Sequence, residues 1–187
     1  MEVDAVGRQL IFVNIFEVIH DSFEPFLDGE KRALNVMEAT NLWFFLAISE
    51  TTMRNEEVAY NLAQDQELKD RLWDAKASVH QPIAKEIQDF LLAERVPLPK
   101  GTPPKPVGDF QLIPEGAKLN DEEIANLMSF NLLLGINYAS RGLTESIRAD
   151  VGLIFFKVIV RKTIFGATLK KLMDQRGWLH DPPVYKS

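Results

Sequence analysis

Glu-x-x-His pairs are the sequence feature most directly tied to metal chemistry in helical bundles, and this chain contains one, Glu17-Val-Ile-His20. A di-iron bundle takes carboxylates from two helices and a Glu-x-x-His pair from each of the other two. The single pair here precedes the segments that we expect to form the bundle. The sequence therefore predicts no complete di-iron centre, and the pair is better explained as the polar edge of an amphipathic helix.

A second candidate ligand, Glu38, lies early in the first helix expected in the bundle, but it stands three residues after Asn35. An Asn followed at the third position by Glu is the pattern of a capping box, in which each side chain accepts from the other residue's backbone N–H. A carboxylate there also interacts favourably with the positive end of the helix dipole. We therefore interpret Glu38 as a helix cap rather than as a ligand.

The most promising polar group combines His80 with Glu50, Asn131 and Asp150. Counting residues from the expected turns between helices places all four near the middle of a bundle. Polar groups buried there must find partners, because an unmet one costs roughly 1–3 kcal/mol. We prefer the interpretation that the four hydrogen-bond to one another. A surface position for at least two of them, and a mononuclear metal site, stay open as alternatives.

In the metal alternative, His80, Asp150 and Glu50 would hold one iron or zinc ion, with Asn131 as the fourth polar group. A carboxylate partner would raise the pKa of His80, whereas burial alone would lower it. Pro82 cannot donate a backbone hydrogen bond, so we expect a kink or break in the helix beside His80. This disturbance, and the lack of a second Glu-x-x-His pair, favour a protein without a metal or other cofactor.

The elements that must position these residues are four amphipathic helices, because apolar residues recur at spacings of three and four in four segments. Asn35 and Asn120 are cap signals for the first and third helices. Gly142 is the expected end of the third, Thr144 the expected cap of the fourth, and Gly177 its end. The expected helices are 35–63, 66 to before Pro97, 120–142 and 144–176.

Residues 96–119, between the second and third helices, hold most of the ten prolines of the chain. A helix of about 28 residues is about 42 Å long, and about 24 extended residues can span more than that. The segment can therefore return the chain to the other end of a bundle. The sequence thus predicts an all-α, ferritin-like antiparallel four-helix bundle with one long crossover, formed by residues 31–187.

Residues 1–30 are expected to form a separate N-terminal arm. Phe12, Phe16, Ile19 and Phe23 recur at helical spacing, although the β-branched residues around them also favour a strand. We expect an extra N-terminal helix that buries its apolar side chains against the bundle or against a second copy of the chain. Exposed apolar patches of this kind are rare on monomers, and a homodimer is therefore the expected state.

Several short motifs, taken in their order and spacing, resemble an uncharacterised ferritin-like four-helix-bundle family found mostly in bacilli. The motifs are Leu34-Asn-Val-Met-Glu38, His80, Pro97-x-Pro99, Gly135, Tyr138, Arg148-x-Asp150 and Gly177-Trp-Leu-x-x-Pro182-Pro183. Some members of the family are duplicated in tandem, and this chain looks most like the second half of such a member. The resemblance implies the fold and no established activity. Pro82 departs from the pattern, since an ordinary helical residue is expected there.

The composition of the chain argues against several classes of function. The net charge of −6 argues against broad contact with nucleic acid or an anionic membrane, and the chain has no cysteine. Five basic residues of the fourth helix are interpreted as a solvated face: Lys157, Arg161, Lys162, Lys170 and Lys171. No phosphate-binding loop or catalytic triad is apparent. We expect a cytoplasmic, non-catalytic bundle that works by self-association or partner binding, with a degenerate metal-binding protein as the alternative.

Overall fold

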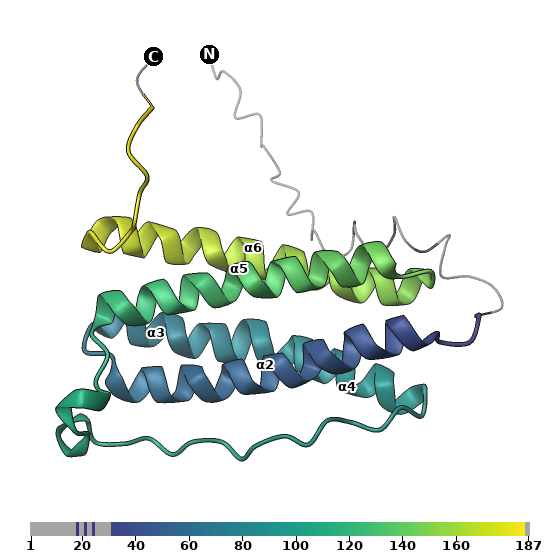
Figure 1. Ribbon diagram of the computed structural model, residues 1–187, viewed down its shortest axis with the longest axis horizontal. Coiled ribbons are helices and arrows are strands. Elements are labelled where there is room, and N and C mark those ends of the chain that lie inside the picture. Colours follow the sequence, from purple (N-terminus) through teal and green to yellow (C-terminus); the bar gives the residue numbers. More distant parts are fainter. Residues whose placement is uncertain (1–17, 19–20, 22–23, 25–30, 186–187) are drawn as a thin grey trace, which may run out of the picture.

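The computed structural model describes residues 31–185 and three positions of the arm, namely 18, 21 and 24. Its regular elements, within this part of the chain, are all helical (Figure 1). Their bounds are α2 Val36–Leu62, α3 Gln66–Asp74, the π-helical η1 Ala75–His80, α4 Gln81–Ala93, α5 Asp121–Glu145 and α6 Ala149–Arg176. The expectations for the Glu17–His20 pair and for the burial of Phe12, Phe16 and Ile19 lie outside the described residues.

The helices form an antiparallel bundle of four segments, because α3, η1 and α4 continue one another. This segment runs antiparallel to α2. The helices α5 and α6 form a second antiparallel hairpin, and the connection from α4 to α5 runs along the whole bundle (Figure 1). α2 also packs against α5, and α6 also packs against the π-helical segment. The predicted all-α bundle with one long crossover is thus confirmed.

Local capping signals bound the helices at several of the predicted places. Asn35 accepts hydrogen bonds from the N–H groups of Met37 and Glu38, and a second capping box joins Asn120 to Glu123 at the start of α5. At the end of α6, Gly177 has a φ of 70°, the left-handed conformation that glycine adopts without steric cost.

The predicted end of the third helix is wrong. Gly142 lies inside α5, and a Cβ added to it would lie 2.5 Å from the ring of Phe155, so this glycine is required by packing rather than by a turn. Thr144 does not cap α6, because its hydroxyl donates back to the carbonyls of Ser140 and Arg141. α5 continues to Glu145 instead.

The crossover is held along α2 by several hydrogen bonds. Trp43 donates to the carbonyl of Pro97 at 3.0 Å, and the backbone N–H of Gly108 donates to Asn61 at 2.9 Å. Two short 3₁₀ turns, η2 (Phe110–Leu112) and η3 (Glu115–Ala117), precede α5. The crossover thus closes one side of the bundle and leaves α5 and α6 uncovered by it (Figure 1).

The irregularity expected next to Pro82 is confirmed as a π-helical segment. η1 ends at His80, where the N–H of Gln81 donates to the carbonyl of Lys76, five residues earlier. Pro82 follows directly as the second residue of α4, and because η1 and α4 are continuous, its missing N–H and its ring disturb the regular hydrogen bonds of the preceding turn. π-Helical insertions often occur at functional sites, which directs attention to the side chains that this segment carries.

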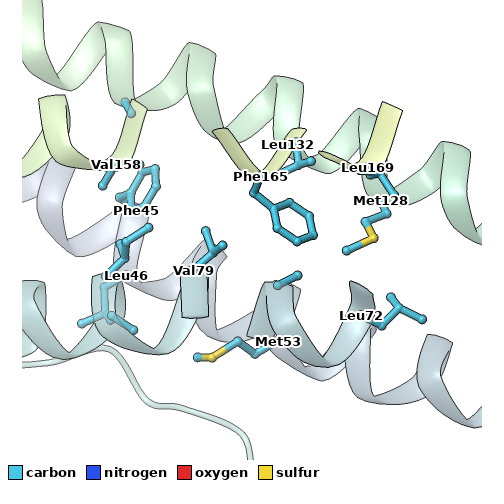
Figure 2. Packing of buried hydrophobic residues seen from close by; sticks show 14 of the residues in the cluster. Phe45, Leu46, Met53, Leu72, Val79, Met128, Leu132, Val158, Phe165 and Leu169 are labelled. Atoms are coloured by element: carbon cyan, nitrogen blue, oxygen red, sulfur yellow. The ribbon is translucent and has the colours of Figure 1, made fainter. Parts of the chain in front are cut away.

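The core is a continuous apolar cluster shared by all four helical segments. Figure 2 shows how side chains from α2, the α3–α4 segment, α5 and α6 meet between the helices. Labelled members are Phe45, Leu46, Met53, Leu72, Val79, Met128, Leu132, Val158, Phe165 and Leu169. Fully burying such a side chain contributes about 1.5–3 kcal/mol, so this packing fixes the positions of the polar side chains among them.

Candidate functional site

The centre of the bundle contains a buried carboxylate–histidine pair. His80, at the end of η1, lies with its Nε2 atom 3.1 Å from Oε1 of Glu56 on α2. The two residues are 3% and 6% exposed. The other polar atom of each, Nδ1 of His80 and Oε2 of Glu56, is buried and accepts no hydrogen bond from any described residue. The pair is therefore only half satisfied.

A buried lysine lies near this pair. Lys162 of α6 is 3% exposed, which corrects the expectation that it belongs to a solvated basic face. Its terminal atoms pack over Gly135 of α5: a Cβ added there would lie 2.9 Å from Cε and 3.0 Å from Nζ. The absence of a side chain at Gly135 thus makes room for an ammonium group inside the bundle.

The helix α5 contributes Asn131 to the same region. Asn131, Glu56 and His80 line one small cavity between α2, η1 and α5. Its volume is about 20 Å³ when counted for the centres of water-sized spheres, and about 10–15 Å³ on that measure is enough for one water molecule. The cavity is far too small for an organic substrate. We refer to Glu56, His80, Asn131 and Lys162 as the central cluster.

Burial dominates the electrostatics of the central cluster. Burial lowers the pKa of His80, the nearby charge of Lys162 lowers it further, and the hydrogen bond and charge of Glu56 only partly oppose this. Burial also lowers the pKa of Lys162 to about 8, against the attraction of Glu56. At neutral pH a neutral imidazole therefore donates from Nε2 to Glu56, and Lys162 supplies the positive charge that balances the carboxylate.

Two of the four residues predicted to meet at the centre make their contacts elsewhere. Glu50 accepts a hydrogen bond from Gln88 at 3.0 Å, and Asp150 lies at the start of α6. Neither lines the cavity beside His80. The prediction counted residues from the turn as if both helices were regular and ended level, but residues 63–65 are not helical and η1 changes the helical phase before His80.

Neither Glu56 nor the burial of Lys162 was predicted from the sequence, although each residue lies on an apolar stripe. Glu56 comes three residues after the buried Met53, and Lys162 lies between Val158 and Phe165 at spacings of four and three. A charged residue at such a position is the pattern to look for, because charged side chains are rarely buried without a partner.

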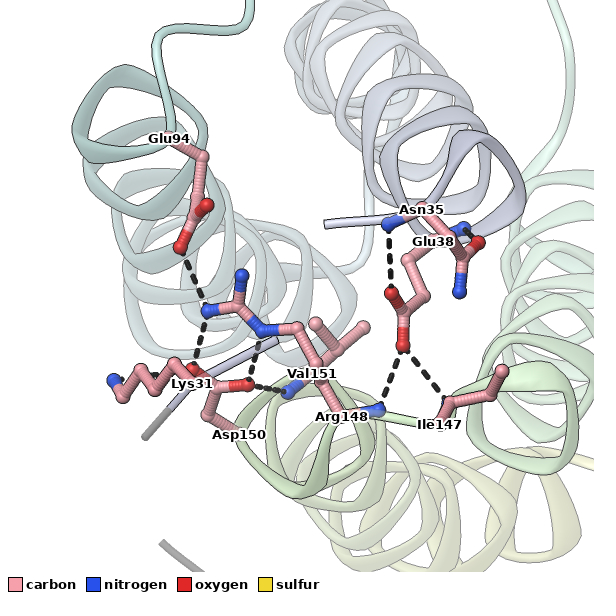
Figure 3. A network of polar contacts seen from close by, with 8 residues as sticks. All are labelled: Lys31, Asn35, Glu38, Glu94, Ile147, Arg148, Asp150 and Val151. Atoms are coloured by element: carbon pink, nitrogen blue, oxygen red, sulfur yellow. Dashed lines mark hydrogen bonds and ion pairs between the residues drawn. The ribbon is translucent and has the colours of Figure 1, made fainter. Parts of the chain in front are cut away.

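A second buried polar group joins the start of α2, the end of α4 and the start of α6 at one end of the bundle (Figure 3). Glu38, 1% exposed, accepts at Oε2 from the N–H of Asn35 and at Oε1 from the N–H groups of Ile147 and Arg148, at 2.8 and 2.7 Å. The capping box predicted for Glu38 is confirmed. The same carboxylate also caps α6, so it binds the starts of two helices together.

Arg148 extends this group toward α4 (Figure 3). Its guanidinium contacts both oxygens of Asp150, at 3.0 and 2.8 Å, and Glu94 at 2.7 Å, while Lys31 approaches Asp150 at 3.2 Å. Burial alone would raise the pKa of Asp150, but the hydrogen bonds from Arg148 and Lys31 outweigh it and lower that pKa. We refer to Glu38, Glu94, Arg148 and Asp150 as the helix-end network.

These arrangements differ from what a resident metal ion requires. Among the described residues, no three or more histidine, aspartate or glutamate side chains are grouped so as to hold a metal ion. The central cluster offers one carboxylate and one imidazole as strong ligands, and the neighbouring ammonium of Lys162 repels a cation. The described residues of the central cluster therefore do not fit an iron or zinc centre.

The described helices include none that is both long and apolar enough to cross a membrane. Comparison with known proteins gives a family: the model described as "Protein of unknown function (DUF3231)" matches residues 24–187. An uncharacterised protein of Bacillus subtilis, YvdQ, is 27% identical over 148 residues, which cover 79% of this chain and 86% of that protein.

Two solved structures are similar to the bundle. A crystal structure from Bacillus halodurans, of a protein named as a candidate spore coat protein, has 28% sequence identity and a TM-score of 0.81, and the match covers 83% of this chain and 98% of the other. A conserved hypothetical protein from Mycobacterium tuberculosis, 12% identical with a TM-score of 0.61 and coverage of 74% and 98%, shares the fold alone. None of these names carries the ferritin-like description, which stays an expectation.

Proposed function

We propose that this chain, which belongs to the DUF3231 family of proteins of unknown function, is a non-catalytic helical bundle that acts by associating with a second copy of itself. The observation that carries the proposal is the outer surface of α5. Residues 125–140 of this helix contain no charged residue. A helix whose outer side lacks charge and carries large apolar residues normally buries that side against a partner.

Several exposed side chains of α5 are large and apolar. Five of them are between 43% and 55% exposed: Leu127, Phe130, Leu133, Leu134 and Tyr138. On the neighbouring α2, Phe44, Ile48 and Val58 follow the same helical stripe as Asn55, which faces α5 across the small cavity. We define the α2/α5 face as Phe44, Ile48, Leu127, Leu134 and Tyr138.

A second copy is the partner that this face fits best. Depletion of charge together with large apolar and aromatic residues is typical of the core of a protein–protein interface. Two-fold dimers pair the same patch on both subunits, and an uncharged patch meets its own copy without like-charge repulsion. The chain as a whole carries a net charge of −6, so this face is where two copies repel each other least.

The centre of the bundle supports a role without catalysis. The cavity beside His80 holds about one water molecule, and Lys162 supplies the cation that a metal would otherwise provide. The metal-binding alternative, built on His80, Asp150 and Glu50, has no observation in its favour. We therefore assign the central cluster to the architecture of the bundle and not to a reaction.

A structural role in an assembled layer is the form of this function that the name of one similar protein favours. The Bacillus halodurans protein, with 28% identity and a TM-score of 0.81, is named for a spore coat. A coat is built by association, and a bundle that self-associates suits such a layer. This gives a second location to test beside the expected cytoplasmic one, by fractionating cells and spores with an antibody against the chain.

Light scattering over a concentration series tests the association. We expect a mass of about twice the chain mass of 21.3 kDa, and dissociation when Leu134→Glu and Tyr138→Glu are combined. The matched control combines Val107→Glu with Leu112→Glu, which places the same two charges at crossover residues that are 81% and 82% exposed. A wild-type protein that stays monomeric at every concentration, or a double variant with unchanged mass, would refute the proposal.

A further inference from the structure

The side of α5 that faces α6 carries a groove separate from the α2/α5 face. Its volume is about 520 Å³, and its walls include Phe130, Leu133 and Ile136 of α5. On α6 the lining residues include Gly166 and Ala167, whose small side chains leave the groove open. An apolar trough beside small residues can receive the large side chains of another helix.

We propose that this groove is the docking site of the chain's own N-terminal arm, with the apolar side of residues 12–23 lying in it as a helix. The three described positions of that segment, Val18, Asp21 and Glu24, are helical and exposed. They are spaced by three, so they share one side of a helix.

The arm has the complementary apolar side. On a helix of 3.6 residues per turn, Phe12, Phe16, Ile19 and Phe23 lie opposite the side that Val18 and Asp21 define. Four large apolar residues would therefore face away from the exposed positions. A segment with one polar and one apolar side needs an apolar surface to bury the second.

The point at which the arm leaves the bundle lies within reach of the groove. Nζ of Lys31 lies 3.2 Å from Asp150, at the start of α6. On α6 the groove begins at Lys162, twelve residues further along the helix, which is about 18 Å. Seven extended residues span up to about 25 Å, so the chain between 24 and 31 can bring Phe23 to the near end of the groove.

The lengths and charges also agree. A helix over residues 12–23 is about 17 Å long, and the α5 wall of the groove, from Asn126 to Ile136, is about 15 Å long. Residues 9–27 contain three carboxylates and no lysine or arginine. The charged residues that line the groove are two lysines, Lys162 and Lys170, so the groove and the arm carry opposite charges.

Disulfide trapping tests the docking in the full chain, which has no cysteine of its own. Ala167→Cys in the groove is combined, one at a time, with cysteine at positions 12, 16, 19 and 23. The matched controls place the second cysteine at the exposed positions 18, 21 and 24. We expect mild oxidation to give an internal disulfide at least tenfold faster for the first set, as mass spectrometry of the monomer band would show.

The outcomes separate this proposal from the self-association proposed above. Disulfides that join two chains would overturn it, because a second copy's arm would then occupy the groove. Equal rates for both sets of positions, or no disulfide in either, would also overturn it. A monomer by light scattering together with the expected disulfide pattern would refute the self-association alone and leave the docking of the arm in place.

Discussion

The helix-end network and the central cluster are both buried and polar, but their atoms are paired to very different degrees. In the network, Glu38 accepts three backbone hydrogen bonds and Arg148 contacts two carboxylates. In the central cluster, His80 and Glu56 each keep a buried atom without a partner among the described residues. The first group therefore stabilises the ends of the helices. The second holds incompletely paired charge in the core, which lowers the stability of the fold.

The difference follows from where backbone groups are free. Helix starts present N–H groups that need acceptors, so a carboxylate such as Glu38 finds partners there. In the middle of a bundle every backbone group is already bonded within its own helix. Glu56, His80 and Lys162 must therefore rely on one another, and three side chains from three helices satisfy each other incompletely.

The largest effect is expected at the helix-end network. Glu38→Ala removes the acceptor of three N–H groups, each costing roughly 1–3 kcal/mol when left unmet, and should lower the free energy of unfolding by roughly 3–5 kcal/mol in urea denaturation. Glu123→Ala removes the same capping box from α5 at an exposed position and should cost about 1 kcal/mol. Equal losses would mean that Glu38 does not join the two helices.

The buried lysine of the central cluster should make the free energy of unfolding depend on pH in alkaline solution. The pKa of Lys162 is lowered from 10.5 to about 8. Between these values the unfolded chain holds a proton that the folded chain has lost, so the free energy of unfolding should rise with pH, by about 3 kcal/mol in total. Urea denaturation from pH 7 to 10.5 measures the rise. A Lys162→Met variant should lack it, and the same slope in both proteins would contradict the burial of a charged lysine.

A double-mutant cycle at pH 7 tests whether Glu56 balances Lys162. Glu56→Gln keeps an acceptor for His80 but removes the charge, and Lys162→Met removes the ammonium. We expect the double variant to lose roughly 1–2 kcal/mol less than the sum of the single variants. The control cycle uses Glu86 and Lys157, which lie 2.8 Å apart but are partly exposed, and should give a coupling below about 1 kcal/mol. Equal couplings would show that burial adds nothing.

The smallest effect concerns metal. Because Lys162 supplies the cation at the centre, zinc or iron(II) added to the protein should leave its melting temperature unchanged. Elemental analysis of protein purified without an affinity tag should find well under one metal ion per chain. One ion per chain that disappears with His80→Ala would instead support the metal-binding alternative and reverse the interpretation of the central cluster.

The sequence by itself determined what depends on neighbours along the chain. The capping boxes at Asn35 and Asn120, the stop at Gly177 and the disturbance before Pro82 were all predictable, because a cap, a turn and a proline act on the next few residues. The apolar periodicity and the proline-rich crossover were enough to predict the bundle and its topology.

Tertiary structure alone decided which side chains meet. Gly142 was wrongly predicted as a helix end. Its contact with Phe155 explains the glycine, but Phe155 lies on another helix and the contact cannot be predicted from the neighbouring sequence. Glu56, rather than Glu50 or Asp150, faces His80 because the offset between helices and the π-helical segment set the register. Each of these depends on the relative height and rotation of two packed helices. The local sequence signals are compatible with shifts of a few ångströms in that packing, but such shifts change which side chains meet at the centre.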